Sequence, residues 1–149
     1  MPKLTTPDRV NLNYTDIGSG RPIVMIHGWP LSGAAFADNA TVFAAAGYRV
    51  ITYDRRGFGQ SGKPRDGYDY DTLAADLDAL LTGLDLRDVV LLGFSMGGGE
   101  VARYLATRGS GRVGAAILSG SICPALCITK DNPDGAMPRE GFQELADAC

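Results

Sequence analysis

Short apolar stretches of strand length recur along the chain, and turn residues separate them. Most of these stretches are uninterrupted, which is typical of strands in a parallel sheet that is covered on both faces. The first expected strand instead alternates apolar and polar residues, as a half-buried strand does. The expected strands span residues 10–14, 23–26, 48–53, 88–94 and 113–118.

Between the strands, apolar residues recur every three or four positions, as they do on the buried side of a helix. The first helix is expected at residues 36–44, and the second has Asp69 and Asp71 as candidate N-terminal caps. The third is expected to end at Gly109, and a short fourth helix to begin near Glu140. The apolar positions of the second and third helices are Leu73, Leu77, Leu80, Leu81, Leu84, Val101, Tyr104 and Leu105.

The alternation of strands and helices predicts an α/β fold with a mostly parallel twisted sheet and helices on both faces. Right-handed crossovers are expected to join the parallel strands. No repeat or low-complexity linker divides the 149 residues, so a single domain is expected over residues 1–149. The pattern loosens from Gly120 onward, and residues 132–135 are expected to form a turn.

A glycine-rich motif follows the apolar run at residues 89–92 and has the sequence Gly93-Phe94-Ser95-Met96-Gly97. A buried strand precedes this G-x-S-x-G motif and an amphipathic helix follows it, which is the setting of a nucleophile elbow. The amides at the helix N-terminus would face the charge that develops at the serine. Ser95 is therefore the candidate catalytic nucleophile. The alternative is an ordinary serine in a glycine-rich turn.

A second glycine motif, at residues 57–62, matches the dinucleotide-binding pattern G-x-G-x-x-G. That function requires a helix to open directly at the turn, so that its amides face the pyrophosphate. Here Lys63-Pro64 and further turn residues follow, and the next helix begins only near Asp71. No nucleotide or other cofactor is expected at this loop.

The segment His27-Gly28-Trp29-Pro30 follows the strand at residues 23–26. An oxyanion hole needs two backbone N–H groups, one after the nucleophile and one from the loop that follows this strand. Met96 and Trp29 occupy those two positions, with His27 and Gly28 supporting the loop. The alternative is a turn with a packed tryptophan.

Together these motifs resemble the N-terminal part of an α/β-hydrolase, and most of all the cofactor-free haloperoxidases, also known as perhydrolases and related to arylesterases. The matching segments are residues 27–30, 53–61, 93–98 and 132–135. The resemblance implies hydrolysis of a small ester or acyl substrate through an acyl-serine. It also implies a side reaction in which peroxide releases a peracid, which oxidises halide without metal or haem. Residues 120–149 would begin a lid-like region, and Trp29, Phe94 and Met96 suggest an apolar acyl pocket.

The family's triad runs serine, then aspartate, then histidine along the chain. No histidine follows Ser95 here, and the only one, His27, lies upstream. The acid and base of the triad, and the later strands of the family fold, are therefore missing from this sequence. Three interpretations stay open: a fragment or split half that needs a partner chain, a small hydrolase with an improvised base, and a non-catalytic binding or assembly module. For His27, support of the oxyanion loop is the favoured role, and Asp54 is expected to be held by Arg55 and Arg56.

Composition narrows the possible partners. Asp and Glu outnumber Lys and Arg by 17 to 14, and this net charge of -3 gives no basic footprint for nucleic acid. No signal-peptide core opens the chain and no apolar run approaches the ~20 residues of a membrane span, so a cytoplasmic location is expected. The odd number of cysteines, without a signal peptide, argues against a disulfide framework, and a metal site would need more ligands than they offer. Cys123, Cys127 and Cys149 are therefore expected to be free thiols.

The strand at residues 113–118, from Val113 to Leu118, is expected to be an edge, because the later strands of the family fold are missing. Its side chains are apolar and include no charge that would discourage pairing. A homodimer built around this side of the sheet is therefore expected, most often with two-fold symmetry.

Overall fold

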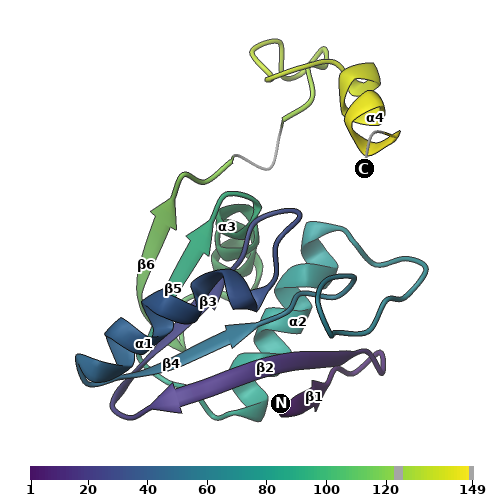
Figure 1. The fold of residues 1–149 in the computed structure, drawn as a ribbon. Helices are drawn as coiled ribbons and strands as arrows, with labels where there is room; N and C mark the ends of the chain where they lie inside the picture. Colours follow the sequence, from purple (N-terminus) through teal and green to yellow (C-terminus); the bar gives the residue numbers. More distant parts are fainter. Residues whose placement is uncertain (123–125, 148–149) are drawn as a thin grey trace.

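The computed structural model of the chain describes residues 1–122 and 126–147 and contains a six-stranded sheet in the order β1-β2-β4-β3-β5-β6 (Figure 1). The strands are β1 (Lys3–Thr5), β2 (Asn11–Gly18), β3 (Arg21–Ile26), β4 (Tyr48–Tyr53), β5 (Val89–Phe94) and β6 (Val113–Ser119). β2 pairs antiparallel with β1 and β4, whereas β4, β3, β5 and β6 pair in parallel. The expected mostly parallel sheet is confirmed.

Helices lie on both faces of this sheet, as expected. η1 (Gly33–Phe36) and α1 (Ala37–Ala45) pack on one face, and α2 (Tyr70–Gly83) and α3 (Met96–Arg108) on the other. A further helix, α4 (Arg139–Asp147), follows β6 in the chain and covers neither face (Figure 1). At the start of α2, the side chain of Asp69 accepts a hydrogen bond from Thr72 N–H at 2.9 Å and caps the helix. Asp71, the other candidate cap, instead lies in the first turn of α2. Gly109 ends α3 with a φ of 78°, a conformation that favours glycine.

The alternation of side chains along each central strand sends neighbours to opposite faces of the sheet, and each face has its own core. On one face, Val24 and Ile26 of β3 pack with α2 and α3. On the other face, Ile23 and Met25 pack beneath α1. This two-sided burial explains why the central strands are uninterrupted apolar runs. The helix side chains involved are Ala74, Leu77, Leu80, Leu81, Val101 and Tyr104 on the first face and Phe36, Ala40, Phe43 and Ala44 on the second.

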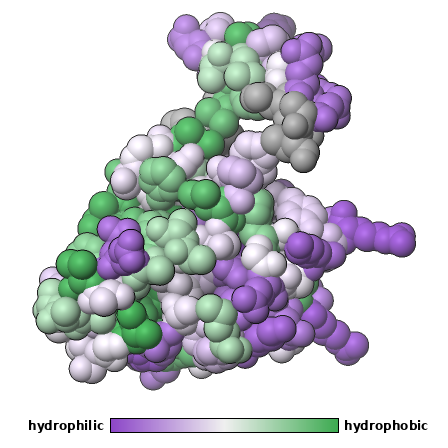
Figure 2. All heavy atoms as spheres, in the orientation of Figure 1, coloured by the Kyte–Doolittle hydropathy of each residue, from purple (hydrophilic) through white to green (hydrophobic). Residues whose placement is uncertain are grey.

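β6 lies at the free edge of the sheet (Figure 1). Every residue after Val113 in this strand is exposed, including Ile117 at 47% and Leu118 at 58%. Figure 2 shows hydrophobic side chains gathered on the flank that β6 forms in Figure 1. No helix among the described residues covers β6 as α1 to α3 cover the central strands.

Beyond β6, the described chain resumes at Leu126. A bridge between Cys127 and Met137 and another between Thr129 and Asn132 organise the loop that precedes α4. The expected turn at residues 132–135 falls within this loop, and the expected fourth helix is α4. Cys127 is a free, half-buried cysteine, while Cys123 and Cys149 lie outside the described residues. The expected lid-like role of residues 120–149 stays a prediction.

Candidate active site

Ser95 occupies the sharp turn between β5 and α3. Its φ of 51° and ψ of −119° place a residue with a side chain in a region that few residues other than glycine adopt. Such a conformation costs on the order of 1–3 kcal/mol and persists only where the surroundings impose it. Here the backbone of Ser95 is fixed on both sides, because its N–H donates to Ser119 O at 3.0 Å and its C=O accepts from Gly98 N–H at 3.0 Å. The side chain makes no capping hydrogen bond to α3.

The glycines around Ser95 are required by close backbone approaches. A methyl group added to Gly93 would lie 2.6 Å from the carbonyl oxygen of Gly97, one turn further on. A methyl group on Gly97 would overlap the carbonyl oxygen of Ile26, at the end of β3. The small residues on both sides of the serine therefore let α3 start directly against the sheet.

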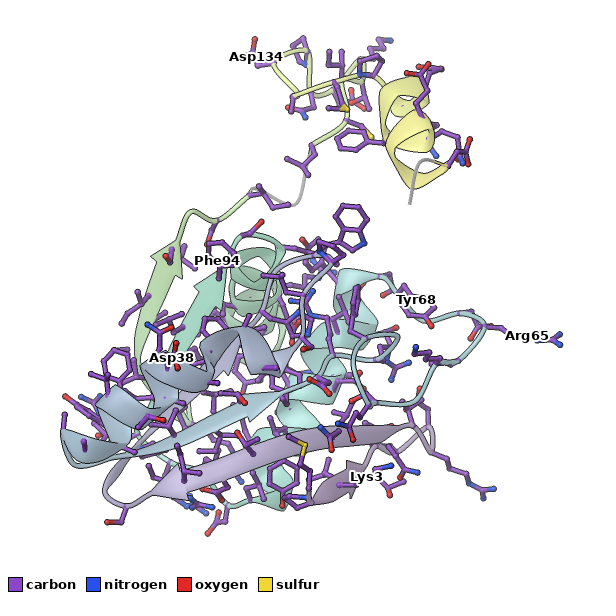
Figure 3. All side chains as sticks on the ribbon, viewed as in Figure 1. Lys3, Asp38, Arg65, Tyr68, Phe94 and Asp134 are labelled. Atoms are coloured by element: carbon purple, nitrogen blue, oxygen red, sulfur yellow. The ribbon has the colours of Figure 1, made fainter. Side chains whose placement is uncertain are left out.

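The loop that follows β3 lies next to the elbow. A methyl group added to Gly28 would lie 2.9 Å from Ser95 Cβ, so only glycine leaves room for the serine there. The Trp29–Pro30 peptide bond is cis, and Leu31 N–H closes the turn onto Gly28 O at 3.0 Å. The structure thus brings His27, Gly28 and Ser95 together at the carboxyl edge of the parallel strands, where Figure 3 labels Phe94.

His27 is fully buried, and both of its ring nitrogens are engaged. Nε2 accepts a hydrogen bond from Arg55 N–H at 3.1 Å, which leaves the proton on Nδ1, where it donates to Gly28 O at 2.8 Å. The pKa of His27 is lowered from 6.5 to about 4, mainly by burial; the hydrogen bond to Gly28 opposes this shift, and the charge of Arg55 adds to it. The imidazole is therefore neutral near pH 7 and has no free nitrogen to accept a proton from Ser95.

The expectation that Arg55 and Arg56 hold Asp54 is wrong, because the carboxylate of Asp54 has other partners. Its carboxylate accepts hydrogen bonds from Gly33 N–H at 2.9 Å, from Gln60 N–H at 2.8 Å and from Asn13 Nδ2 at 3.1 Å. Gly33 begins η1, just after the loop beside Ser95. Asp54 therefore ties the segment after β4 to the far end of that loop.

The two arginines instead form buried ion pairs with helices. Arg55 Nε lies 2.7 Å from Glu100 Oε2, and both side chains are fully buried. Arg56 contacts Asp76 of α2 through Nε and Nη2, each at 2.6 Å, and Nη2 also reaches Asp8. The hydrogen bonds that Arg56 donates to Asp76 raise the pKa of Arg56 above its ordinary value, while burial raises the pKa of Glu100.

Glu100 was not singled out from the sequence. It lies in the first part of α3, it is buried like Val101 and Tyr104, and its Oε1 accepts a hydrogen bond from Tyr53 Oη. The signal that could have found it is its position, one residue before Val101 and four before Tyr104, on the apolar stripe of the helix. A charged residue on such a stripe is almost never buried without a partner.

An apolar cavity of about 320 Å³ lies beside the elbow, between α1 and the sheet. Its lining includes Phe94, as expected for an acyl pocket, but neither Trp29 nor Met96. Trp29 is 48% exposed at the protein surface instead. The cavity is lined by Met25, Leu31, Ala35, Phe36, Asn39, Phe43, Leu92, Phe94 and Ser119.

The glycine loop at residues 57–62 leads into an irregular segment rather than a helix, and Figure 3 shows Arg65 of this segment pointing away from the sheet. Tyr68 instead packs over Gly57 and donates to Pro64 O at 2.6 Å. Within residues 1–122 and 126–147, no three His, Cys, Asp or Glu side chains are grouped as a metal ion would require. In that same part of the chain, no helix has the length and apolar character needed to cross a bilayer.

Comparison with known proteins agrees with this geometry. A family model described as the alpha/beta hydrolase fold matches residues 21–145. The chain belongs to the α/β-hydrolase family. A non-heme chloroperoxidase from Kitasatospora aureofaciens is 52% identical over 97% of the chain and 52% of its own length. The resemblance to cofactor-free haloperoxidases is thereby confirmed.

Two solved structures are similar across almost the whole chain. A bromoperoxidase from Bacillus anthracis superposes with a TM-score of 0.89 at 45% identity, over 96% of this chain and 52% of its own. An esterase from Exiguobacterium antarcticum gives a TM-score of 0.91 at 38% identity, over 98% and 54%. The chain spans about half the length of the relatives it matches. The catalytic roles of Ser95, Trp29 and Met96, and the supporting roles of His27 and Gly28, stay predictions.

Proposed function

We propose that the chain carries the nucleophile half of a serine esterase. Ser95 is the nucleophile, and the backbone N–H groups of Trp29 and Met96 form the oxyanion hole. The observation that carries this proposal is the positive φ of Ser95 at a strand-to-helix turn packed against Gly28. Strain of this kind is concentrated at functional sites, and an ordinary turn has no need of a serine there.

In the proposed reaction, Ser95 Oγ attacks the carbonyl carbon of a small ester and its proton passes to a base. The two amides stabilise the oxyanion of the tetrahedral intermediate, which collapses to an acyl-serine as the alcohol leaves with a proton. Water then releases the carboxylic acid. Hydrogen peroxide in place of water releases a peracid, which accounts for oxidation of halide without a metal or haem.

The general base comes from polypeptide beyond these 149 residues. His27, the only imidazole, is occupied at both ring nitrogens and has a pKa of about 4, which argues against an improvised base on this chain. The relatives are about twice as long as this chain, which supports the split-half interpretation. Esterase activity of the isolated chain should then be feeble, since loss of the triad lowers kcat by ~10⁴–10⁶.

The test is acylation of the purified chain by p-nitrophenyl acetate, followed by the release of p-nitrophenol and by intact mass. We expect slow acetylation of one site that disappears in Ser95→Ala, because the oxyanion hole and binding alone retain ~10³–10⁴-fold catalysis over water. Ser119→Ala is the matched control, since Ser119 contacts the elbow through its backbone oxygen. Equal acetylation of the parent chain and Ser95→Ala would refute the proposal.

A second experiment separates the split half from a non-catalytic module. The part of the Kitasatospora chloroperoxidase that has no counterpart in this chain is added to the purified chain. If that part supplies the acid and base, ester turnover should rise well above the turnover of the isolated chain. If the complex forms without any gain in turnover, the non-catalytic interpretation is favoured. The cytoplasmic location expected from the sequence stays a prediction.

We also propose that, in the absence of such a half, β6 pairs with β6 of a second copy. The support is an outer strand without charge or proline, whose Ile117 and Leu118 are 47% and 58% exposed. Light scattering should show a dimer at micromolar concentration, and Ile117→Lys should shift it to the monomer by adding an edge charge. Val42→Lys, at an exposed apolar position on α1, is the control and should leave the dimer intact. A monomeric parent chain would rule the dimer out.

A further inference from the structure

Arg55 contacts the loop beside Ser95 in two ways. Its backbone N–H donates to the ring of His27, and its guanidinium Nη2 donates to the carbonyl oxygen of the same residue. His27 immediately precedes Gly28 and Trp29, so both contacts act on the residue that sets the course of the proposed oxyanion loop.

The other side of the same guanidinium reaches the nucleophile helix. Nε lies 2.7 Å from Glu100 Oε2, on α3, and Glu100 is held in turn by Tyr53 of β4. α3 begins at Met96, directly after the nucleophile. One buried side chain thus joins the two separate elements that would each supply a donor to the oxyanion hole.

We propose that Arg55, oriented by Glu100, is a positioning residue that fixes the distance between the Trp29 and Met96 amides. The inference rests on the proposed function of Ser95. An oxyanion hole depends on two donors about 3 Å from one oxygen, and a displacement of about 1 Å can cost ~10²-fold in rate. A buried pair that spans both donor elements meets that requirement, whereas its contribution to stability is uncertain in sign, because desolvation offsets the attraction.

The chain contains a matched control for this pair. Arg56 is the next residue, is as deeply buried, and forms an ion pair with Asp76 at 2.6 Å. It contacts α2 and Asp8, and neither of these belongs to the loop at residues 27–30. Loss of the Arg56 pair should therefore disturb the fold to a similar degree without moving the oxyanion loop.

The experiment compares the double variant Arg55→Met/Glu100→Gln with Arg56→Met/Asp76→Asn. Gln keeps an acceptor for Tyr53, and removing both charges together avoids an unpaired buried charge. Arg55→Lys is a milder variant, because one ammonium keeps the charge beside Glu100 but cannot match the fork of a guanidinium. Two quantities are measured in each chain: NMR hydrogen exchange of the Leu31 amide, which donates to Gly28 O within the loop, and the acylation of Ser95 at rising ester concentration.

We expect exchange of the Leu31 amide to be roughly 10–100-fold faster in the Arg55 double variant and near the parental value in the Arg56 variant. The maximal acylation rate should fall by about the 10²-fold expected for one displaced donor, with half-saturation unchanged. For Arg55→Lys, both the exchange rate and the maximal acylation rate should lie between those of the parent chain and the double variant. If the role of Arg55 were purely structural, its loss would speed exchange throughout the domain. The maximal acylation rate and the ester concentration at half-saturation would then change together.

Three results would contradict the proposed role of Arg55. Unchanged exchange of the Leu31 amide in both Arg55 variants would overturn the inference, as would equal acceleration in the Arg56 control. Faster loop exchange with unaltered acylation would also overturn it, because the loop would then not serve the reaction. If the parent chain fails to acylate at Ser95 at all, the proposed function falls, while selective loosening of the loop would still support the hold of Arg55 on it.

Discussion

The single histidine allows a direct test of the site, because His27 should titrate far below the usual range of imidazoles. It is fully buried, and the neutral ring with its proton on Nδ1 satisfies both Gly28 O and Arg55 N–H. Protonation would place a second donor on Nε2, against the N–H of Arg55 and beside its positive charge. These contacts are consistent with the pKa of about 4 that results mainly from burial.

The same shift makes stability depend on pH in a predictable direction. The unfolded chain takes up a proton at His27 below pH 6.5, whereas the folded chain does so only near pH 4. The stabilising effect of the neutral ring is therefore complete above pH 6.5 and is lost as the pH falls toward 4, by about 3 kcal/mol. Asp8 and Asp69 have lowered pKa values and lose their stabilising effect below this window, whereas burial raises the pKa of Glu100 and acts in the opposite direction.

Two measurements check this prediction. The imidazole proton signals of His27 need no assignment, because the chain has one histidine, and they should stay unchanged from pH 8 to about pH 5. Urea unfolding at several pH values, compared with His27→Gln, isolates the contribution of the ring from that of the carboxyl groups. A pKa of 6 to 7, or the same pH dependence in His27→Gln, would refute the reasoning and would reopen a role for His27 as a base.

Three further changes have sizes that follow from the structure. Asp69→Ala should lower the free energy of unfolding by about 1 kcal/mol through loss of the α2 cap, and Asp71→Ala, in the exposed first turn, by less, as measured by urea unfolding. Leu80→Ala, at a fully buried position of α2, should cost about 2–5 kcal/mol, and a loss below 1 kcal/mol would mean that the core is not packed as described. Gly97→Ala should slow acylation of Ser95 as well as destabilise the chain, because its methyl group would push α3 away from Ile26. Gly111→Ala, where nothing lies nearby, is the control for that change.

The fold was predictable from the sequence where burial alone determines the pattern. Residues 48–53 were expected as a strand and form β4 with the same bounds, because β-branched and aromatic residues fill most of this segment between two turns. β1 was missed, since Lys3–Thr5 is three residues long and only Leu4 among them is even partly buried. β2 was expected to end at residue 14 but continues to Gly18, because its second half pairs with β4 along a surface of mixed polarity.

The candidate site was predictable from the sequence only where its residues form a short contiguous motif. The spacing around Ser95 points to a turn that needs small residues, and Gly93 and Gly97 do lie against neighbouring backbone. The partners of Asp54 and Arg55 could not be found in this way. Asp54 lies beside two arginines in the sequence, yet the turn after β4 directs its carboxylate to backbone amides and sends Arg55 to Glu100, 45 residues away.

The contacts of Asp54 and Arg55 indicate that the segment after β4 supports the loop beside Ser95, whereas its glycine pattern suggests nucleotide binding. Asp54 accepts the N–H of Gly33 at one end of the loop beside Ser95, and Arg55 holds His27 at the other end. The position of that loop is thus set by two consecutive residues of the segment after β4, and less by its own sequence. The glycines that follow allow the chain to turn closely: Gly59 has a φ of 50°, and a methyl group there would overlap the carboxylate of Asp54. The G-x-G-x-x-G match is therefore explained by the support of a loop, and a bound nucleotide is not needed to account for it.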